Sequence, residues 1–329
     1  MIIAEIAQAH DGSLGILHSY IDALASTGVD AVKFQTHIAD AESSAYEPFR
    51  VKFSYEDDTR YDYWKRMEFT REQWAGIKKH CEDKGLEFIS SPFSNMAVDM
   101  LEDIGVKRYK VGSGEITNHL LLHRIALTRK PVIVSSGMST WEELDEAVHF
   151  FEFKQIDVSV LQCTSAYPAK PAQWGLNIIQ QLKERYKTKV GYSDHSGGIY
   201  ACLAAAALGA EIFEFHAVFD KRMFGPDALA SITIDEIKKL AEGIHQIKTA
   251  LHHPAVKNSA GMEAMKAIFE KSLAVNQPLQ KGTILEFKHL EAKKPKGFGV
   301  DAAKYNNVVG KKLVTDKQQW EFLQETDIE

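Results

Sequence analysis

The amino-acid sequence predicts an α/β protein built as a (β/α)8 TIM barrel followed by a small β-rich domain. Eight short apolar or β-branched runs occur in the first 220 residues, and amphipathic stretches separate them. The runs are continuously hydrophobic, as expected for a parallel sheet covered by helices. Polar side chains follow almost every run, as they do where a barrel carries its functional face.

The predicted strands alternate with helices along the chain. The strands are expected at 2–7, 31–35, 87–92, 108–112, 131–136, 158–164, 189–193 and 212–218, and helices at 14–27, 71–84, 140–151, 201–209 and 234–251. An open, doubly wound sheet shows the same alternation, but it usually has a glycine-rich turn after its first strand. The sequence contains neither G-x-G-x-x-G nor a Walker A motif. Eight strands therefore favour the closed barrel.

The composition changes after the last predicted barrel helix. Residues 251–329 contain twelve lysines and no arginine, and turn signals at 281–282 and 296–299 separate short strand-like pieces at 272–275, 283–285 and 308–313. We predict a barrel at 1–255, a linker at 256–267 and a small β-rich domain at 268–329. A domain of about 60 residues is barely large enough to stand alone, so we expect it to dock on its own barrel or a partner's.

Overall composition excludes several classes of protein. Lysine plus arginine (39) against aspartate plus glutamate (45) gives a net charge of -6, which argues against a general nucleic-acid binder. No window approaches an uninterrupted apolar membrane span, and the N-terminus lacks a basic region followed by an apolar one. The cysteines Cys81, Cys163 and Cys202 lie far apart and outside any C-x-x-C pair. We expect a cytoplasmic protein with no membrane or nucleic-acid partner.

Two histidines end neighbouring predicted strands. His195 closes the seventh strand and His216 closes the eighth, so their side chains could converge at the barrel mouth. Two neutral imidazoles suit Mn²⁺, Fe²⁺, Co²⁺ or Zn²⁺ better than Ca²⁺. The alternative is that each histidine is a hydrogen-bonded barrel residue. The pairing at matched strand ends favours the metal site.

Lysine and serine side chains cluster at the ends of strands two to five. A lysine within an apolar strand is costly unless it is paired or faces a ligand. Such donors are suited to a phosphate and a carboxylate. Two alternatives remain: a Schiff-base aldolase with a desolvated lysine nucleophile, and lysines that extend to the barrel rim. The residues are Lys33, Ser90, Ser91, Lys110, Ser113, Ser135 and Ser136.

Other polar residues near the strand ends have candidate roles. Glu5 lies within the first strand, so it should meet a cation, a metal or a substrate hydroxyl, and we predict proton transfer or sugar binding. Tyr167 could donate to a substrate carboxylate. Glu115 and Asp194 could orient a lysine or a metal-bound histidine. Cys163 is predicted to be an inert core thiol, because no activating histidine adjoins it in the sequence.

At these residues the sequence resembles the sialic acid synthase family, which comprises N-acetylneuraminate synthase and its legionaminate and pseudaminate relatives. The resemblance covers nearly the whole chain. The C-terminal part, with KSLAVNQPLQKG at 271–282 and VGKK at 309–312, is similar to the family's antifreeze-like (SAF) domain. The barrel motifs, in family order, are IIAEI at 2–6 with HDG at 10–12, DAVKFQT at 30–36, SPFS at 91–94, YKVGSGE at 109–115, SGMST at 136–140, CTSAYP at 163–168 and GYSDH at 191–195.

The resemblance implies condensation of phosphoenolpyruvate with an open-chain N-acylhexosamine such as N-acetylmannosamine, releasing phosphate. It implies a homodimer in which the SAF domain of one subunit caps the barrel of the other. A divalent metal would be held by His195 and His216, with Mn²⁺ preferred and Mg²⁺ or Co²⁺ as alternatives. The remaining roles are phosphoenolpyruvate binding by Lys33, Ser91, Lys110, Ser113 and Ser135 or Ser136, catalysis by Glu5 and Tyr167 with the histidines, and sugar binding by Gln35, Ser165, Asp227 and Lys294.

The sequence departs from the family pattern mainly in the sugar half of the site. Lys294 stands where the family has an arginine that reaches the N-acyl group, and lysine cannot reproduce the guanidinium fork. The identity of the sugar therefore stays open. The alternatives are a legionaminate or pseudaminate-type synthase using a diacetamido-hexose and a non-catalytic sugar-binding protein. The other departures are Ala7, Ala9, Ser165, Phe215 and Ala228.

Overall fold

A computed structural model describes residues 1–51 and 53–329. The chain divides into two compact units, Met1–Pro254 and Ala255–Glu329. The sequence predicts a linker at 256–267, but the structure forms a short helix, α11 (Glu263–Phe269), across the end of that range. Isoleucine, methionine and alanine spaced along 264–268 make that helix amphipathic, a signal too short to separate from a linker by sequence alone.

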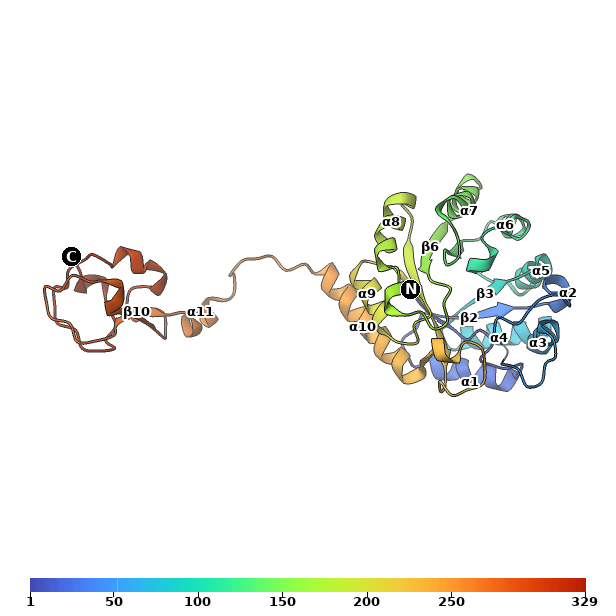
Figure 1. The fold of residues 1–329 in the computed structure, drawn as a ribbon, viewed down its shortest axis with the longest axis horizontal. Helices are drawn as coiled ribbons and strands as arrows, with labels where there is room; N and C mark the ends of the chain where they lie inside the picture. Colours follow the sequence, from blue (N-terminus) through green and yellow to red (C-terminus); the bar gives the residue numbers. More distant parts are fainter. Residues whose placement is uncertain (52) are drawn as a thin grey trace. The chain divides into compact units, whose positions relative to one another are not determined.

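The first unit is a closed barrel of eight parallel strands inside a ring of helices (Figure 1). Strand β1 pairs with β2 on one side and with β8 on the other, which closes the sheet. A two-residue strand, β9 (Ile232–Thr233), pairs in parallel with the last residues of β8. The predicted TIM barrel is confirmed. The barrel strands are β1 (Ile2–Glu5), β2 (Ala31–Thr36), β3 (Glu87–Pro92), β4 (Tyr109–Val111), β5 (Val132–Ser135), β6 (Val158–Cys163), β7 (Val190–Asp194) and β8 (Ile212–Val218).

The helices of the first unit begin where the sequence offers capping residues. Thr70, Thr140 and Thr233 each form a capping box with the residue three positions later, which satisfies free N–H groups at the helix start. Their apolar faces pack on the strands in one large core. The helices are α1 (Leu14–Leu24), α2 (Ala39–Glu42), α3 (Arg60–Met67), α4 (Arg71–Asp83), α5 (Asn95–Ile104), α6 (His119–Ala126), α7 (Trp141–Phe153), α8 (Leu176–Tyr186), α9 (Tyr200–Ala207) and α10 (Ile234–His252).

The barrel interior is layered. Side chains on a strand alternate between the interior and the helices, so residues two apart share the interior. At the N-terminal end a buried apolar layer fills the barrel, formed by Ile3, Ala31, Ile89, Ile133, Leu161 and Ile212. Two residues further along the same strands stand Glu5, Lys33, Ser91, Ser135, Cys163 and Glu214, all buried. A charged and hydroxyl-bearing layer therefore rests directly on an apolar floor.

The second unit has a core of its own. Eight buried residues, including Leu273, Val275, Leu285 and Leu323, form it. Strand β10 (Ser272–Val275) pairs antiparallel with β11 (Leu290–Lys293). The predicted strands at 283–285 and 308–313 are wrong: Ile284, Lys312 and Leu313 make only isolated bridges. The glycine turns at 282 and 297 have the positive φ that the turn signals predict.

The described residues contain no helix that combines the length and the apolarity needed to cross a lipid bilayer. The helix predicted at 234–251 corresponds to α10, and His252 and His253 are exposed where it stops.

Candidate active site

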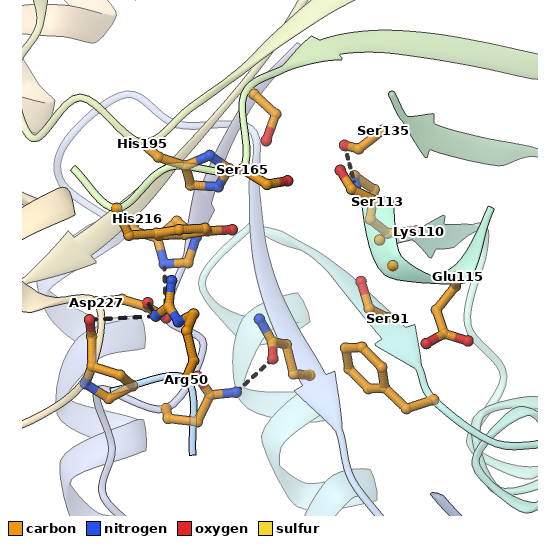
Figure 2. Close-up of a pocket in the computed structure, with 18 of the residues that line it drawn as sticks. Arg50, Ser91, Lys110, Ser113, Glu115, Ser135, Ser165, His195, His216 and Asp227 are labelled. Atoms are coloured by element: carbon orange, nitrogen blue, oxygen red, sulfur yellow. Dashed lines mark hydrogen bonds and ion pairs between the residues drawn. The ribbon is translucent and has the colours of Figure 1, made fainter. Parts of the chain in front are cut away.

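The carboxyl ends of the barrel strands surround a cavity of about 540 Å³ (Figure 2). Most of the sequence-predicted site residues line it. His195, His216 and Asp227 lie on one side with Ser165 near His195, and Ser91, Lys110, Ser113 and Ser135 lie on the other (Figure 2). Predicted residues that line the cavity are Lys33, Gln35, Ser91, Lys110, Ser113, Ser135, Ser165, Tyr167, His195, His216 and Asp227.

Two buried lysines and two buried carboxylates form the deepest part of the site. Lys33 pairs with Glu5 and lies 3.7 Å from Glu214. Lys110 lies 3.8 Å from the same Glu214 oxygen. Ser193 donates to this oxygen at 3.2 Å. Glu214 is therefore the carboxylate shared by both lysines, which allows two ammonium groups to coexist in the barrel interior.

The two lysines have different electrostatic surroundings. Burial opposes the charge of Lys33, but attraction by Glu214 and Glu5 outweighs it and raises the pKa of Lys33. Burial lowers the pKa of Lys110, and Glu214 offsets only part of this because the charge of Lys33 opposes it. Lys33 is the more firmly charged of the two, and Lys110 is the more easily deprotonated.

Hydroxyl groups surround Lys110 on its cavity side. Its ammonium donates to Ser135 Oγ at 2.7 Å and to the Val111 carbonyl at 3.1 Å. Ser113 Oγ accepts the Gly137 backbone N–H at 3.0 Å. Ser91 lies buried on the cavity wall. These ammonium and hydroxyl donors could bind an anion with several oxygens.

Gly137 packs tightly against this cluster, and its replacement by alanine should damage the site more than the fold. A Cβ there would lie 2.5 Å from Ser165 Oγ, 2.6 Å from Ser113 Oγ and 2.9 Å from Cys163 Sγ. We expect Gly137→Ala to cost about 1 to 3 kcal/mol of stability through overpacking. Displacing the serine hydroxyls should lower kcat/KM by about tenfold or more, since one hydrogen bond to a charged group is worth about 1.5 to 3 kcal/mol.

The measurement for Gly137→Ala is chemical denaturation together with steady-state kinetics. Gly76→Ala is the control, because nothing lies within 4 Å of a Cβ at that position on α4. A wild-type kcat/KM in Gly137→Ala would contradict the prediction, because it would show that activity does not depend on the positions of the Ser113 and Ser165 hydroxyls.

The two histidines lie side by side at the cavity wall. The ring centroids of His195 and His216 are 5.1 Å apart. His195 Nδ1 lies 3.0 Å from the Thr164 carbonyl, which can only accept, so Nδ1 carries the proton and Nε2 keeps its lone pair. Burial lowers the pKa of both histidines, with carboxylates nearby offsetting only part of the effect. Both imidazoles are therefore neutral.

The upper wall of the cavity combines aromatic and charged groups. The Arg50 guanidinium lies 4.2 Å from the centre of the Tyr167 ring. Its Nη2 donates to Asp227 Oδ1 at 2.5 Å, and the other Asp227 oxygen lies 3.8 Å from His216 Nδ1. Burial raises the pKa of Tyr167, so its phenol stays protonated and can donate.

Four predicted site residues do not line the cavity. Ser90 precedes the inward-facing Ser91 on β3, so strand alternation points it away, and its hydroxyl donates to the Phe34 carbonyl at 3.2 Å. Glu5 lies behind Lys33 and accepts from Gln35 Nε2 at 3.2 Å, so it supports these residues from below. Side chains alternate along a strand, so Ser136, which follows the inward-facing Ser135, points away from the cavity. Its hydroxyl donates to the Leu161 carbonyl. Lys294 belongs to the second unit, where it is exposed with its ammonium over the Phe269 ring at 4.8 Å.

Three expectations about supporting residues are also corrected. Asp194 bonds the backbone and hydroxyl of Ser196 and does not hold a histidine or a lysine. Glu115 lines the cavity and accepts from Asn118 at 2.7 Å. Cys163 does adjoin a histidine, since its sulfur lies 3.8 Å from His195 Nδ1, although burial raises the pKa of the thiol.

Sequence reasoning missed several cavity residues. Glu214 could have been found, because it stands two positions before His216 on the same strand and so faces the same interior. The others come from the first turn of the barrel and from the connection between β2 and α4, whose path no periodicity reveals. They are Gln8, His37, Glu42, Glu47, Arg50, Arg60 and Trp64.

Comparison with known proteins identifies the family. The model of the NeuB family matches residues 20–255. The chain is 34% identical to N,N'-diacetyllegionaminic acid synthase of Campylobacter jejuni, over 99% of each chain. It is 30% identical to human N-acetylneuraminate-9-phosphate synthase, over 98% of this chain and 91% of the relative.

A solved structure with the same fold supports this result. The N-acetylneuraminic acid synthetase of Leptospira borgpetersenii, crystallised with citrate, superposes with a TM-score of 0.72 at 32% identity. The match covers 80% of this chain and 89% of that chain. With the barrel, the paired histidines and the lysine and serine cluster in place, the chain belongs to the NeuB family.

Proposed function

We propose that this protein condenses phosphoenolpyruvate with the open-chain form of an N-acylhexosamine and releases phosphate. The observation that carries the proposal is the pair of neutral histidines above a buried layer of lysine ammonium and serine hydroxyl groups. Phosphoenolpyruvate C3 attacks the sugar aldehyde carbon, water adds at C2, and the tetrahedral intermediate expels phosphate. One carbon–carbon bond forms, and one water is consumed.

The charged layer suits the three-carbon substrate. Lys33 and Lys110 provide ammonium groups for its phosphate and carboxylate, and Ser91, Ser113 and Ser135 provide hydroxyl donors. Glu214 keeps both lysines inside the barrel without occupying all of their donors. These residues orient phosphoenolpyruvate in the barrel interior.

We propose that His195 and His216 hold a divalent metal, with Mn²⁺ preferred and Mg²⁺ or Co²⁺ as alternatives. The residues fit such an ion: both imidazoles are neutral, and the Thr164 carbonyl fixes His195 with Nε2 free. Among the described residues no cluster of three or more histidine, cysteine or acidic side chains could hold a metal, so water and substrate oxygens would complete the shell. When bound, the ion supplies Lewis-acid polarisation of a carbonyl oxygen.

The upper wall suits the sugar. Tyr167 keeps its proton, so its O–H can donate a hydrogen bond to a sugar hydroxyl or to the sugar oxygen on which negative charge develops. Gln35, Ser165 and Asp227 line the same region. Glu5 acts on this region only through Gln35 and Lys33, which corrects its predicted direct role.

The acceptor is an N-acylhexosamine, and a diacetamido-hexose is the second candidate. The observation that favours the second is the 34% identity over 99% of both chains with a legionaminic acid synthase. We also propose a homodimer whose second unit, carrying Lys294, covers the barrel mouth of the other copy. Light scattering on the full chain tests the dimer.

The experiment that tests the proposed function is phosphate release from phosphoenolpyruvate with a panel of acceptors. The panel contains N-acetylmannosamine, its 6-phosphate and a 2,4-diacetamido-hexose, each with Mn²⁺ and with EDTA. We expect release with at least one sugar and its loss in EDTA. No release with any sugar by the metal-loaded protein would overturn the proposal and leave a sugar-binding protein.

A lysine-imine mechanism predicts a different result. The lowered pKa of Lys110, caused by burial, is the feature that such an aldolase needs. We expect no covalent adduct when the protein is treated with pyruvate and borohydride, because Glu214 and Ser135 engage the Lys110 ammonium. Mass spectrometry checks this. A trapped pyruvyl-lysine together with activity in EDTA would favour the aldolase.

A further inference from the structure

His37 is a buried cavity residue with no role in the chemistry above. His37 is 4% exposed and lies in the connection that follows β2. The imidazole is stacked between two aromatic rings, with centroids 3.8 Å from Trp64 and 4.6 Å from Phe93. The ring plane is therefore fixed, and its two nitrogens have fixed directions.

Both nitrogens of His37 have polar partners. Nδ1 lies 2.5 Å from Glu42 Oε1. Nε2 lies 3.1 Å from Gln8 Nε2 and 3.2 Å from Gln35 Oε1. The Gln8 amide nitrogen also donates to Gln35 Oε1 at 2.5 Å.

The chemistry of these groups selects one arrangement of protons. A carboxylate oxygen accepts, so the Glu42 contact assigns a proton to His37 Nδ1, and the contact with the Gln8 amide nitrogen assigns an accepting lone pair to His37 Nε2. Gln8 Nε2 lies against both Nε2 of His37 and Oε1 of Gln35, and its two N–H groups serve one each. Gln35 Nε2 then donates to Glu5 Oε1 at 3.2 Å. These bonds form one hydrogen-bond network from Glu42 to Glu5, in which His37 Nε2 and Gln35 Oε1, 3.2 Å apart, both accept from the Gln8 amide.

This arrangement leaves two amide groups available. Within the described residues, Gln8 Oε1 has no hydrogen bond, and Gln35 Nε2 has one N–H beyond its bond to Glu5. Both residues line the cavity. One available acceptor and one available donor on two hydrogen-bonded amides suit sugar hydroxyls, because each hydroxyl can donate and accept. Reversing the Gln8 amide would place its oxygen against His37 Nε2, and reversing the Gln35 amide would place its oxygen against Glu5.

We propose that His37 is a positioning residue that fixes the amide orientation of Gln8 and Gln35 and thereby sets the hydroxyl pattern of the acceptor sugar. The inference rests on the proposed function and deepens it. His37 acts on the acceptor through two glutamines, and Lys110, Ser113 and Ser135 lie outside the hydrogen-bond network that it organises. Lys33 meets this network only through Glu5 and has a second carboxylate, Glu214, 3.7 Å away. Its loss should therefore affect the acceptor and spare phosphoenolpyruvate.

The experiment compares three variants of His37 in the full-length, metal-loaded protein. His37→Phe keeps an aromatic ring between Trp64 and Phe93 and removes both nitrogens. His37→Gln can place its amide oxygen where Nε2 accepted from Gln8, whereas His37→Asn reaches only towards Glu42. His18→Phe is the control, since His18 contacts His80 on the outer helices and does not line the cavity.

We expect His37→Phe to raise KM for the acceptor about tenfold or more, with KM for phosphoenolpyruvate changed less than about twofold. His37→Gln should recover much of the loss, and His37→Asn should not. If His37→Phe does not fold, Glu42→Gln carries the test, because it removes the group that fixes the ring proton. It should raise the acceptor KM alone.

Two results would overturn the inference while leaving the proposed function intact. One is an acceptor KM in His37→Phe equal to that of the active wild type. The other is an equal rise of both KM values, which would indicate general distortion. Absence of phosphate release by the wild type itself would instead overturn the proposed function, and this inference with it.

Discussion

Replacing Glu214 by glutamine is expected to destabilise the barrel by about 3 to 5 kcal/mol and to abolish phosphoenolpyruvate binding. Glu214 is the carboxylate shared by Lys33 and Lys110, at 3.7 and 3.8 Å. Glutamine keeps the size of the side chain but removes the charge. Lys33 keeps Glu5, whereas Lys110 is left buried without a carboxylate partner of its own. One buried ammonium must then lose its proton or force the site open.

A second substitution separates stability from activity. In Glu214→Gln combined with Lys110→Met the remaining pair, Lys33 with Glu5, is neutral overall. We expect the double variant to recover most of the lost free energy of unfolding but none of the activity, because the Lys110 donors are gone. Chemical denaturation and phosphoenolpyruvate binding by calorimetry measure the two effects.

The control for Glu214 is Glu152→Gln, an exposed carboxylate on α7 for which we expect no change. A single Glu214→Gln variant as stable as the wild type would contradict the shared-carboxylate interpretation. So would a double variant no more stable than the single one.

Replacing His216 by alanine is expected to remove metal binding and lower kcat at least about a thousandfold. The protein offers two imidazoles, with no larger metal-binding cluster in the described part of the chain, so losing one leaves a single ligand. A metal bound there as proposed would supply several kcal/mol of transition-state stabilisation, and about 1.36 kcal/mol is a factor of ten in rate. His195→Ala should have the same effect.

Two measurements check the histidine prediction independently. Calorimetric titration with Mn²⁺ reports metal affinity without substrate, and phosphate release reports activity. His252→Ala is the matched control, because this histidine is exposed at the end of α10 and outside the cavity. Wild-type Mn²⁺ affinity in His216→Ala would remove the metal assignment, even if activity were lost.

The barrel could be predicted from the sequence because its strands are long enough to show their pattern. Eight apolar runs ending in polar residues identified the cavity residues at the strand ends, including Lys33, Lys110, His195 and His216. Strand alternation also explains two failures. Ser136 follows the inward Ser135 and so faces away, and Glu214 shares the interior with His216 but was assigned no role.

The rest depended on contacts that sequence patterns do not encode. Arg50 and His37 reach the cavity from the connection after β2, and packing rather than periodicity sets its path. Cys163 and His195 are 32 positions apart in sequence, and only the pairing of β6 with β7 brings them together. In the second unit, 283–285 is too short for a strand pattern to be distinguished from a turn, and 308–313 is interrupted by Gly310 with its positive φ.

The apolar floor formed by Ile3, Ile89, Ile133, Leu161 and Ile212 closes the barrel below the charged layer. Molecules can therefore enter and leave the cavity only through the mouth. A small anion on Lys33 and Lys110 lies beneath whatever rests against Tyr167 and His37. If phosphoenolpyruvate binds there as proposed, we expect it to enter before the sugar, and we expect the released phosphate to leave after the joined product. The closed floor therefore predicts ordered binding and release for the proposed condensation.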